Sequence, residues 1–380
     1  EKKNLRRSKT MSTEAELFDS EHNVHRYTLV NSKQNFIVKV IDFGATITNI
    51  FVRDKQDVWR DVVLGFDRFD DYLREYNPYF GATVGRFANR IARSSFVLNG
   101  HDYKLETNEK GKNTLHGGYE GFSRKKWSLV DSSSSSLTLH LISANGDQQF
   151  PATVSVTVSF AVNDQCELSI DYNAYLSNFE REKLRTFINL TNHSYFNLNA
   201  CMNAENDSVL NHEIHFTVDK FLENDGDQIP TTEILNVSDI PYMDFTGNSH
   251  SLGAKITVKG SGFDDCYVIN AESDSYSIEG GKELKFIAKV RSPSTGITLD
   301  YFTTEPGFQF YTTNSIEANK VFTKNTQSGN IKRPLRKYCG FCLESQRFPN
   351  SCNVDRWQKQ CLLTDGEEYK QSTVYRFSIS

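Results

Sequence analysis

Residues 152–162, ATVSVTVSFAV, decide the fold, because every second position from Val154 to Val162 is apolar. The positions between them carry serine, threonine and alanine, which are small and mostly polar. Side chains alternate between the two faces of a β-strand, so a period of two sets one apolar row against a core. The stretch therefore predicts a half-buried strand of an antiparallel sheet.

The same alternation recurs on both sides of this stretch, at residues 137–141 and 168–175. Aromatic residues make up 12% of the 380-residue chain, which suits wide sheet faces packed against each other. No internal repeat or change in composition divides the sequence. We therefore expect an all-β fold, one large domain of packed antiparallel sheets over residues 12–380, preceded by a disordered or leftover tail at residues 1–11.

Three shorter signals interrupt the strands. Residues 67–76, DRFDDYLREY, predict one short helix with Phe69 and Leu73 on the same side. The pair Asn99-Gly100 lies between two aromatic-containing runs and predicts a two-residue hairpin loop. Residues 323–337 are polar and basic without an apolar period, so we expect an exposed loop there.

Charge and cysteine content exclude several classes of protein. The formal net charge is -5 with both signs interspersed, which argues against binding to nucleic acid or an anionic membrane. No apolar run reaches the roughly 18 residues of a transmembrane helix, and the first residues lack the apolar core of a secretory signal. The seven cysteines are therefore expected as reduced thiols in a cytoplasmic protein. Cys339 and Cys342 have redox-motif spacing, but a strand would point their thiols to opposite faces.

A histidine lies between apolar runs in residues 191–198, TNHSYFNL. Imidazole titrates near neutral pH and His193 has hydrogen-bonding neighbours on both sides, so it is a candidate general acid. Two interpretations stay open for this residue taken alone: a hydrogen-bonded histidine of the core, or a group that moves protons.

A glutamate in residues 340–350, GFCLESQRFPN, is the candidate general base. Glu344 alternates with the apolar Phe341 and Leu343 and shares a strand face with Cys342. Desolvation would raise the pKa of this carboxyl group and make it a useful base near neutral pH. The alternative is an exposed glutamate of a strand.

Other polar side chains cluster beside aromatic residues or glycines, in GRFANRI at 85–91, NTLHGG at 113–118, GFDDCY at 262–267 and EPGFQFY at 305–311. The glycine pair after His116 is where the backbone would approach a ligand. Such side chains recognise sugar hydroxyls, because they pair donors and acceptors around a rigid ring. Each cluster taken alone also fits a solvated loop or ordinary strand packing.

Metal binding is the main rival use of these side chains. Residues 212–215, HEIH, fall one residue short of the zinc motif H-E-x-x-H, and no phosphate-binding glycine loop follows a strand. His116 and His193 have no second ligand close in sequence. We therefore expect no metal and no cofactor.

Taken in order, GRFANRIA, NTLHGG, TNHSYFNL, GFDDCY, TEPGFQFYT and CLESQRFPNS resemble segments of the aldose 1-epimerase (galactose mutarotase) family. With DFGATITNI near the start, the resemblance spans nearly all of the chain after Met11. It implies a large antiparallel β-sandwich of stacked curved sheets, and an enzyme that interconverts the α and β anomers of free hexoses such as galactose and glucose. The implied general acid is His193 and the implied general base is Glu344. The implied substrate contacts are Asn89, Arg90, His116, Tyr195, Asp264 and Gln309.

The chain departs from the family pattern in two motifs and in a longer loop before Cys339. Asp264 is followed by Asp265-Cys266-Tyr267 where members often carry His-Asn-Phe, and the usual T-P-x-D-x-R stretch ends here in Thr246 without its arginine. These departures concern the rim of the site and the preferred sugar rather than the acid and the base. Asp264 or another carboxylate is expected to help hold the imidazolium.

Three other functions stay open. A hexose 6-phosphate 1-epimerase would need additional cations at the phosphate. A non-catalytic sugar-binding protein on the same sandwich would bind a monosaccharide without accelerating any reaction. A protein-interaction sandwich would have no sugar cavity. The expected partner is a monosaccharide, and the expected assembly is a monomer or a weak dimer.

Overall fold

Antiparallel strands dominate the computed structural model, which describes residues 14–177, 184–270, 276–317, 319–329 and 331–380. The tail predicted at residues 1–11 lies outside the described residues. Within the described ranges the strands form three large sheets and four two-stranded ribbons. The all-β prediction is confirmed.

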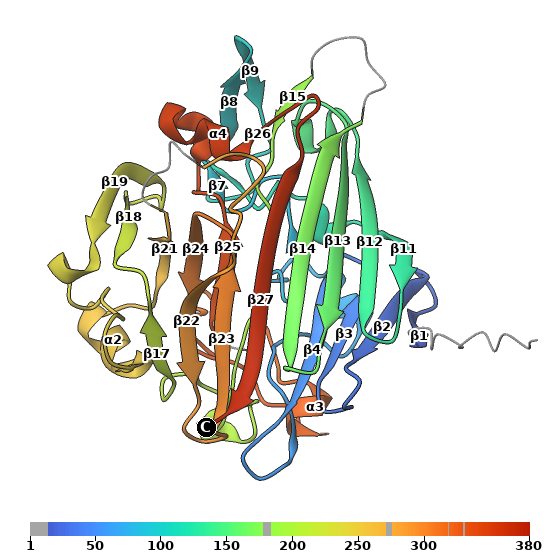
Figure 1. The fold of residues 1–380 in the computed structure, drawn as a ribbon, viewed down its shortest axis with the longest axis vertical. Coiled ribbons are helices and arrows are strands. Elements are labelled where there is room, and N and C mark those ends of the chain that lie inside the picture. The colour runs from blue at the N-terminus through green and yellow to red at the C-terminus, as the bar shows by residue number, and fades with distance from the viewer. Residues whose placement is uncertain (1–13, 178–183, 271–275, 318, 330) are drawn as a thin grey trace, which may run out of the picture.

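The large sheet has nine strands among the described residues, in the order β11-β12-β13-β14-β27-β23-β22-β17-β20 (Figure 1). Their bounds are Ser128–Ser132 (β11), Ser136–Ser143 (β12), Val154–Val162 (β13), Glu167–Leu176 (β14), Tyr369–Ile379 (β27), Ile297–Thr303 (β23), Lys285–Arg291 (β22), Glu213–Phe216 (β17) and His250–Ser251 (β20). All neighbouring pairs are antiparallel. β27, the last of these strands in chain order, lies in the middle of the sheet and joins its two halves.

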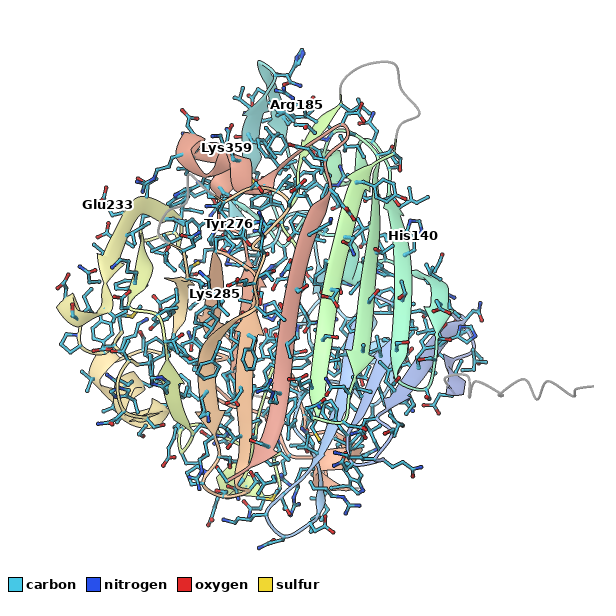
Figure 2. All side chains as sticks on the ribbon, in the orientation of Figure 1. His140, Arg185, Glu233, Tyr276, Lys285 and Lys359 are labelled. Carbon is cyan, nitrogen blue, oxygen red and sulfur yellow. The ribbon has the colours of Figure 1, made fainter. Side chains whose placement is uncertain are left out.

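The stretch that predicts the fold forms β13, and its apolar row from Val154 to Val162 is buried. Its ladder with β14 sets Val158 opposite Tyr172, which is also buried. Figure 2 shows the side chains that stand on the ribbon of this sheet, with His140 at β12 and Lys285 at the start of β22.

The N-terminal sheet packs behind the strands β12 and β13 of the large sheet, as the blue ribbon in Figure 1 shows. Its order is β1-β2-β3-β4-β5. The bounds are Glu14–Asp19 (β1), Val24–Val30 (β2), Ile37–Ile41 (β3), Thr46–Arg53 (β4) and Trp59–Asp61 (β5). Val38 and Ile50 of this sheet share one hydrophobic core with Val156 and Phe160 of β13.

The third sheet, called the cavity sheet below, has the order β19-β18-β21-β24-β25. Its bounds are Pro230–Asn236 (β19), Lys220–Asn224 (β18), Asp264–Val268 (β21), Gly307–Tyr311 (β24) and Cys342–Gln346 (β25). The large sheet supports it, because the Tyr375 hydroxyl on β27 donates to the Leu343 carbonyl at 2.8 Å. The ring of Phe308 on β24 lies 5.6 Å from that of Tyr301 on β23, so aromatic rings fill the space between the two sheets.

Short ribbons and helices close the ends of the sandwich. The ribbons pair Thr83–Val84 (β6) with Thr191–Asn192 (β16), Arg90–Ile91 (β7) with Thr114–Leu115 (β10), Ser95–Leu98 (β8) with His101–Lys104 (β9), and Arg185–Phe187 (β15) with Leu362–Thr364 (β26). The α-helices in the described ranges are Phe69–Leu73 (α1), Leu252–Lys259 (α2), Asn325–Ser328 (α3) and Gln358–Cys361 (α4). Among the residues that the structure describes, no helix combines the length and apolarity needed to cross a membrane.

The predicted helix forms, but it is shorter than residues 67–76 and buries a different pair. Phe69 and Tyr72 of α1 are buried, whereas Leu73 is exposed. In a helix of little more than one turn, the residue three positions after Phe69 completes the inner face. The Asn99-Gly100 hairpin is confirmed, with φ values of 53° and 79°.

The prediction of an exposed loop at residues 323–337 is wrong for part of its length. The segment contains α3, and Lys324 is buried, with its Nζ 2.7 Å from Asp61 Oδ2. Leu335 is buried as well. A buried ion pair draws this polar segment into the interior, and an apolar period cannot reveal such a contact.

Candidate active site

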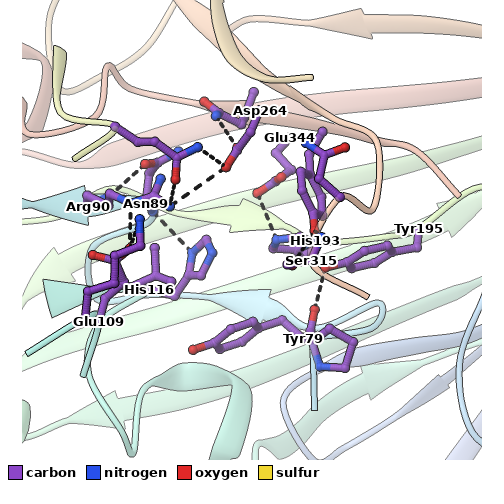
Figure 3. Close-up of a pocket in the computed structure, with 17 residues that line it drawn as sticks. Tyr79, Asn89, Arg90, Glu109, His116, His193, Tyr195, Asp264, Ser315 and Glu344 are labelled. Atoms are coloured by element: carbon purple, nitrogen blue, oxygen red, sulfur yellow. Dashed lines mark hydrogen bonds and ion pairs between the residues drawn. The ribbon is translucent and has the colours of Figure 1, made fainter. Parts of the chain in front are cut away.

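A cavity of about 430 Å³ lies beside the cavity sheet (Figure 3). Its volume falls within the range of small-molecule sites, roughly 300–1,000 Å³. The sequence-predicted site residues that line it are His193, Glu344, Asn89, Arg90, His116, Tyr195, Asp264 and Gln309, which is the whole predicted set. The other lining residues are Pro78, Tyr79, Glu109, Lys110, Leu115, Gln228, Tyr311, Asn314 and Ser315.

One wall of the cavity is a polar face of the cavity sheet. Directly paired residues of antiparallel strands point to the same side, and Gln309 on β24 pairs with Glu344 on β25. Asp264 on β21 pairs in the same way with Tyr311 on β24. Phe308, the neighbour of Gln309, points to the opposite face and the aromatic core. The period of two in β24 thus separates cavity residues from core residues.

His193 approaches this wall from the loop after β16. Its backbone N–H donates to the Ala82 carbonyl at 2.9 Å, and its carbonyl accepts from the Gly81 N–H at 3.0 Å. His193 Nε2 lies 3.4 Å from Glu344 Oε2, and neither side chain is more than 5% exposed. This is a close contact without hydrogen-bond alignment, because Glu344 Oε2 has no hydrogen-bond partner within the described structure. The carboxyl group therefore keeps one buried acceptor for a ligand.

Two neighbours orient the imidazole. The Tyr195 ring stacks on it with a centroid distance of 4.9 Å and an interplanar angle of 15°. The Tyr195 hydroxyl donates to the Pro78 carbonyl at 2.7 Å, which fixes that ring. On the other edge, Cys342 Sγ lies 3.6 Å from His193 Nδ1. Cys342 and Glu344 share one face of β25, as their spacing predicts, and so they contact the two ring nitrogens of one histidine.

Burial governs the charge of the pair. It lowers the pKa of His193 to about 3. It also raises the pKa of Glu344 well above its ordinary value, with a further rise from the charge of Asp264 and a decrease from Arg90. The protein thus favours a neutral imidazole beside a carboxylic acid. Between these two pKa values the pair carries one proton, on Glu344, and transferring it to His193 gives the ionised pair.

His116 adds a hydrogen-bond donor to the cavity. Its ring lies 5.2 Å from that of His193, and its Nδ1 accepts from the Asn89 backbone N–H at 3.3 Å. Burial lowers the pKa of His116 well below its ordinary value, so the ring is neutral with its proton on Nε2. A Cβ on the following Gly117 would lie 2.2 Å from the Gly85 carbonyl oxygen. Gly117 therefore allows a close approach between two backbone segments, not the approach to a ligand that the sequence predicts.

A chain of polar contacts runs along the side of the cavity where Figure 3 labels Arg90. Arg90 Nη2 donates to Gln228 Oε1 at 2.7 Å, and Gln228 Nε2 donates to Asp264 Oδ2 at 2.8 Å. Gln309 Nε2 donates to Asp264 Oδ1 at 2.7 Å. Amides thus occupy both oxygens of Asp264. The carboxylate in contact with His193 is that of Glu344 rather than that of Asp264.

The arginines of the predicted clusters differ in whether their side chains point into the cavity. Arg90 lines the cavity, whereas Arg86 is buried away from it and donates to the Ser143 carbonyl at 2.9 Å. Arg347, which follows Glu344 by three residues, forms a fully buried ion pair with Glu305. Arg86 and Arg347 therefore hold the framework.

The sequence missed two classes of lining residue. Tyr311 alternates with Gln309 on β24, and the same period of two that separates the faces would have found it. Glu109 and Gln228 come from turns, where no period indicates the direction of a side chain.

Three potential metal ligands meet in the cavity. One donor atom each of His116, His193 and Glu344 lie within 4.8 Å of one another. A metal on His116 Nε2 would require the ring proton on Nδ1, where the Asn89 N–H already donates. The hydrogen bond to His116 therefore opposes metal ligation and favours the role of an N–H donor toward a ligand.

A base and an acid in contact, on the wall of a polar cavity of small-molecule size, can take a proton from one ligand atom and give one to a neighbouring atom. Polar donors and acceptors surround the pair on the other walls. Together with the stacked antiparallel sheets, this arrangement is that of an acid–base isomerase.

The family model described as aldose 1-epimerase matches residues 25–376, and the chain belongs to the aldose 1-epimerase family. The galactose mutarotases of Bos taurus and Homo sapiens are 37% and 35% identical to it over 343 residues, which is 90% of this chain and 91% of theirs. The aldose 1-epimerase of Escherichia coli (strain K12) is 31% identical over 358 residues, covering 93% of this chain and 95% of that protein. The expected isomerase activity, that of an aldose 1-epimerase, is confirmed.

Solved structures agree with the family. A GalM/aldose epimerase homologue from C. elegans has a TM-score of 0.78 at 26% identity, covering 93% of this chain and 98% of that chain. The galactose 1-epimerase from Lactobacillus acidophilus NCFM has a TM-score of 0.76, covering 97% and 99%, and at 20% identity it bears on the fold alone. The predicted sandwich is confirmed.

Proposed function

We propose that this enzyme interconverts the α and β anomers of free hexoses, with Glu344 as the general base and His193 as the general acid. The observation that carries the assignment is the 3.4 Å contact between His193 Nε2 and Glu344 Oε2 inside a polar cavity. Relatives that are named galactose mutarotases support galactose as a substrate, with glucose as the second hexose to test.

Ring opening needs two proton transfers at neighbouring atoms. The carboxylate of Glu344 takes the proton of the C1 hydroxyl, and the electrons of that O–H bond form the C1 carbonyl. The bond between C1 and the ring oxygen breaks, and its electrons take the proton that His193 gives. Both oxygens are attached to C1, so one base and one acid in contact suffice. Each transfer contributes a factor of roughly 10²–10⁴ in rate.

Ring closure uses the same two groups in reversed roles after rotation about the C1–C2 bond. Opening leaves Glu344 protonated and His193 neutral, which are the forms that burial favours. The neutral imidazole then accepts the proton of the ring hydroxyl while the carboxylic acid returns one to the oxygen on C1. The pair regains its starting state as the opposite anomer forms.

The charges in the cavity favour a free sugar over a hexose 6-phosphate. The cationic lining residues among those described are Arg90 and Lys110. Both lie beside the same carboxylate, with Arg90 Nε and Lys110 Nζ at 3.5 and 3.4 Å from Glu109 Oε1. Asp264 Oδ2 lies 3.8 Å from Arg90 Nη2, so the carboxylates of Glu109 and Asp264 together already balance the two cations that a phosphate would need.

A cytoplasmic location fits the state of the cysteines. All seven are free thiols, and only Cys166 is not buried. The single epimerase domain over residues 12–380 and the monomer or weak dimer stay predictions, as does action without a metal or cofactor.

The experiment is polarimetry of α-D-galactose with purified enzyme. Glu344→Gln and His193→Asn should each slow mutarotation by roughly 10²–10⁴-fold, because each removes one proton transfer. Circular dichroism should be unchanged, and glucose 6-phosphate should turn over far more slowly than glucose.

Two matched substitutions serve as controls. Glu233→Gln on β19 and His140→Asn on β12, both labelled in Figure 2, change the same residue types outside the cavity and should leave the rate unchanged. A rate near that of the wild type for a folded Glu344→Gln or His193→Asn enzyme would remove that residue from its role. A wild-type enzyme that binds galactose without accelerating its mutarotation would indicate a sugar-binding protein instead.

A further inference from the structure

Gln228 enters the cavity from the turn between β18 and β19. The side chain of Asp225 fixes this turn, since its Oδ1 accepts from the backbone N–H groups of Asp227 at 2.8 Å and Ile229 at 3.0 Å. Gln228 itself adopts a φ of 60°. The direction of its side chain is thus set by a hydrogen-bonded turn.

The amide of Gln228 lies between a cation and an anion. Its oxygen accepts from Arg90 Nη2 at 2.7 Å, and its nitrogen donates to Asp264 Oδ2 at 2.8 Å. The direct distance from Arg90 Nη2 to Asp264 Oδ2 is 3.8 Å, longer than a hydrogen bond. The amide satisfies both charged groups and keeps them from forming a direct hydrogen-bonded ion pair.

We propose that Gln228 is a specificity-determining residue, which holds Arg90 and Asp264 apart as separate binding groups for the hexose hydroxyls remote from C1. The inference rests on the proposed function, in which C1 and the ring oxygen face Glu344 and His193. Figure 3 labels Arg90 on the side of the cavity away from those two groups. A hexose seated on the acid and the base therefore turns its other hydroxyls toward the contacts of Gln228.

Replacing the amide by an apolar side chain changes what this wall presents. In Gln228→Leu, Arg90 Nη2 and Asp264 Oδ2, now 3.8 Å apart, need to approach by only about 1 Å to form a direct charged hydrogen bond. Groups paired in this way are poorer partners for hydroxyls, and binding weakens about tenfold for each charged hydrogen bond lost. The acid and the base are untouched, so kcat should stay within about threefold.

The first experiment measures binding apart from catalysis. The probe is 1,5-anhydro-D-galactitol, a pyranose without a C1 hydroxyl, and its Kd is measured by calorimetry. Gln228→Leu should weaken binding about tenfold or more, whereas Glu344→Gln should bind the probe nearly as the wild type does. In polarimetry, Gln228→Leu should raise KM and change the ratio of kcat/KM for galactose to that for glucose.

Asp227→Asn is the matched control, because Asp227 lies in the same turn but contacts Lys112 at the surface. It should change neither the Kd nor the ratio. If Gln228→Leu does not fold, Gln228→Glu keeps the size of the side chain, loses the donor to Asp264 and should weaken the probe to the same extent.

Binding of the probe at wild-type affinity by either folded variant, or an unchanged galactose-to-glucose ratio, would overturn the role of Gln228. A wild-type enzyme that fails to accelerate mutarotation would overturn the proposed function instead. These two failures appear in different measurements.

Discussion

His193 and Glu344 together carry one proton over a wide range of pH. Burial lowers the pKa of His193 to about 3 and raises the pKa of Glu344. The state with one shared proton therefore extends from about pH 3 to a value well above the ordinary pKa of a glutamate. Loss of that proton at alkaline pH leaves His193 with nothing to donate.

This sharing predicts the acid side of the pH profile. We expect kcat/KM for α-D-galactose to stay flat between pH 5 and 7, because the free enzyme gains no second proton there. An exposed histidine acting as the base would instead lose activity below its ordinary pKa of about 6.5. Polarimetry in overlapping buffers measures the profile, which reports on the free enzyme. An acid limb with an apparent pKa near 6.5 would contradict the shared proton.

At the residue scale, the sequence predicted which residues line the cavity better than it predicted their contacts. His193 and Glu344 stand out because titratable side chains among apolar neighbours are unusual. Their contact joins positions 151 residues apart, and no local pattern encodes such a distance. The placement of Cys342 against His193 Nδ1 follows from the shared strand face, but only once the histidine has a known position.

Strands and turns differ in how far sequence predicts them. Along β24 the alternation of aromatic and polar residues predicts which side chains face the cavity. The turn that carries Gln228 has no period, so its cavity contacts were not foreseen. The prediction of an exposed loop at residues 323–337 was wrong for a related reason. The burial of Lys324 in this segment depends on the carboxylate of Asp61, which is distant in sequence.

That segment gives a prediction about stability. Lys324 is 2% exposed and Asp61 is fully buried, so Lys324→Met leaves a buried carboxylate without its cation. The free energy of unfolding should fall by about 3–5 kcal/mol, as measured by urea denaturation.

Lys332→Met, in the same segment, is the control. Lys332 is 40% exposed and pairs with Asp67, so this change should cost less than about 1 kcal/mol. Equal losses in the two variants would show that the Lys324 pair contributes no more than a surface contact.

Buried histidines couple the stability of the whole molecule to pH. Burial lowers the pKa of His212 to about 3 and that of His116 well below its ordinary value. His212 is held neutral by its contacts, because its Nε2 accepts from the Leu198 N–H at 3.0 Å and its Nδ1 lies 3.1 Å from Asn211 Oδ1. In the unfolded chain each histidine binds a proton below about pH 6.5.

The direction of this pH dependence follows from the number of protons that the folded and unfolded states bind. Between about pH 6.5 and 3 the unfolded state holds more protons at these two positions, so stability falls as the pH falls. His193 adds little between pH 4.5 and 6.5, because the pair of His193 and Glu344 holds one proton whether folded or unfolded. At pH 5 His212 should cost about 2 kcal/mol, and His116 should act in the same direction.

Urea denaturation at pH 7.5 and pH 5 tests this coupling. His212→Gln should reduce the loss of stability between the two pH values by about 2 kcal/mol relative to the wild type. His140→Gln, on β12 of the large sheet, should leave this loss of stability unchanged. The same loss in His212→Gln as in the wild type would mean that His212 does not couple folding to pH.

The position of β27 constrains how the molecule can be made. Among the described residues, β14 and β23 each pair with this strand, which joins strands β11 to β14 and strands β23, β22, β17 and β20 into one sheet. Side chains of β27 also bond to β25 beneath Glu344. We therefore expect the two halves to stay unjoined during synthesis until residues 369–379 have been added. Nascent chains stalled before that point should expose two unpaired sheet edges, at which chaperones or neighbouring chains can bind.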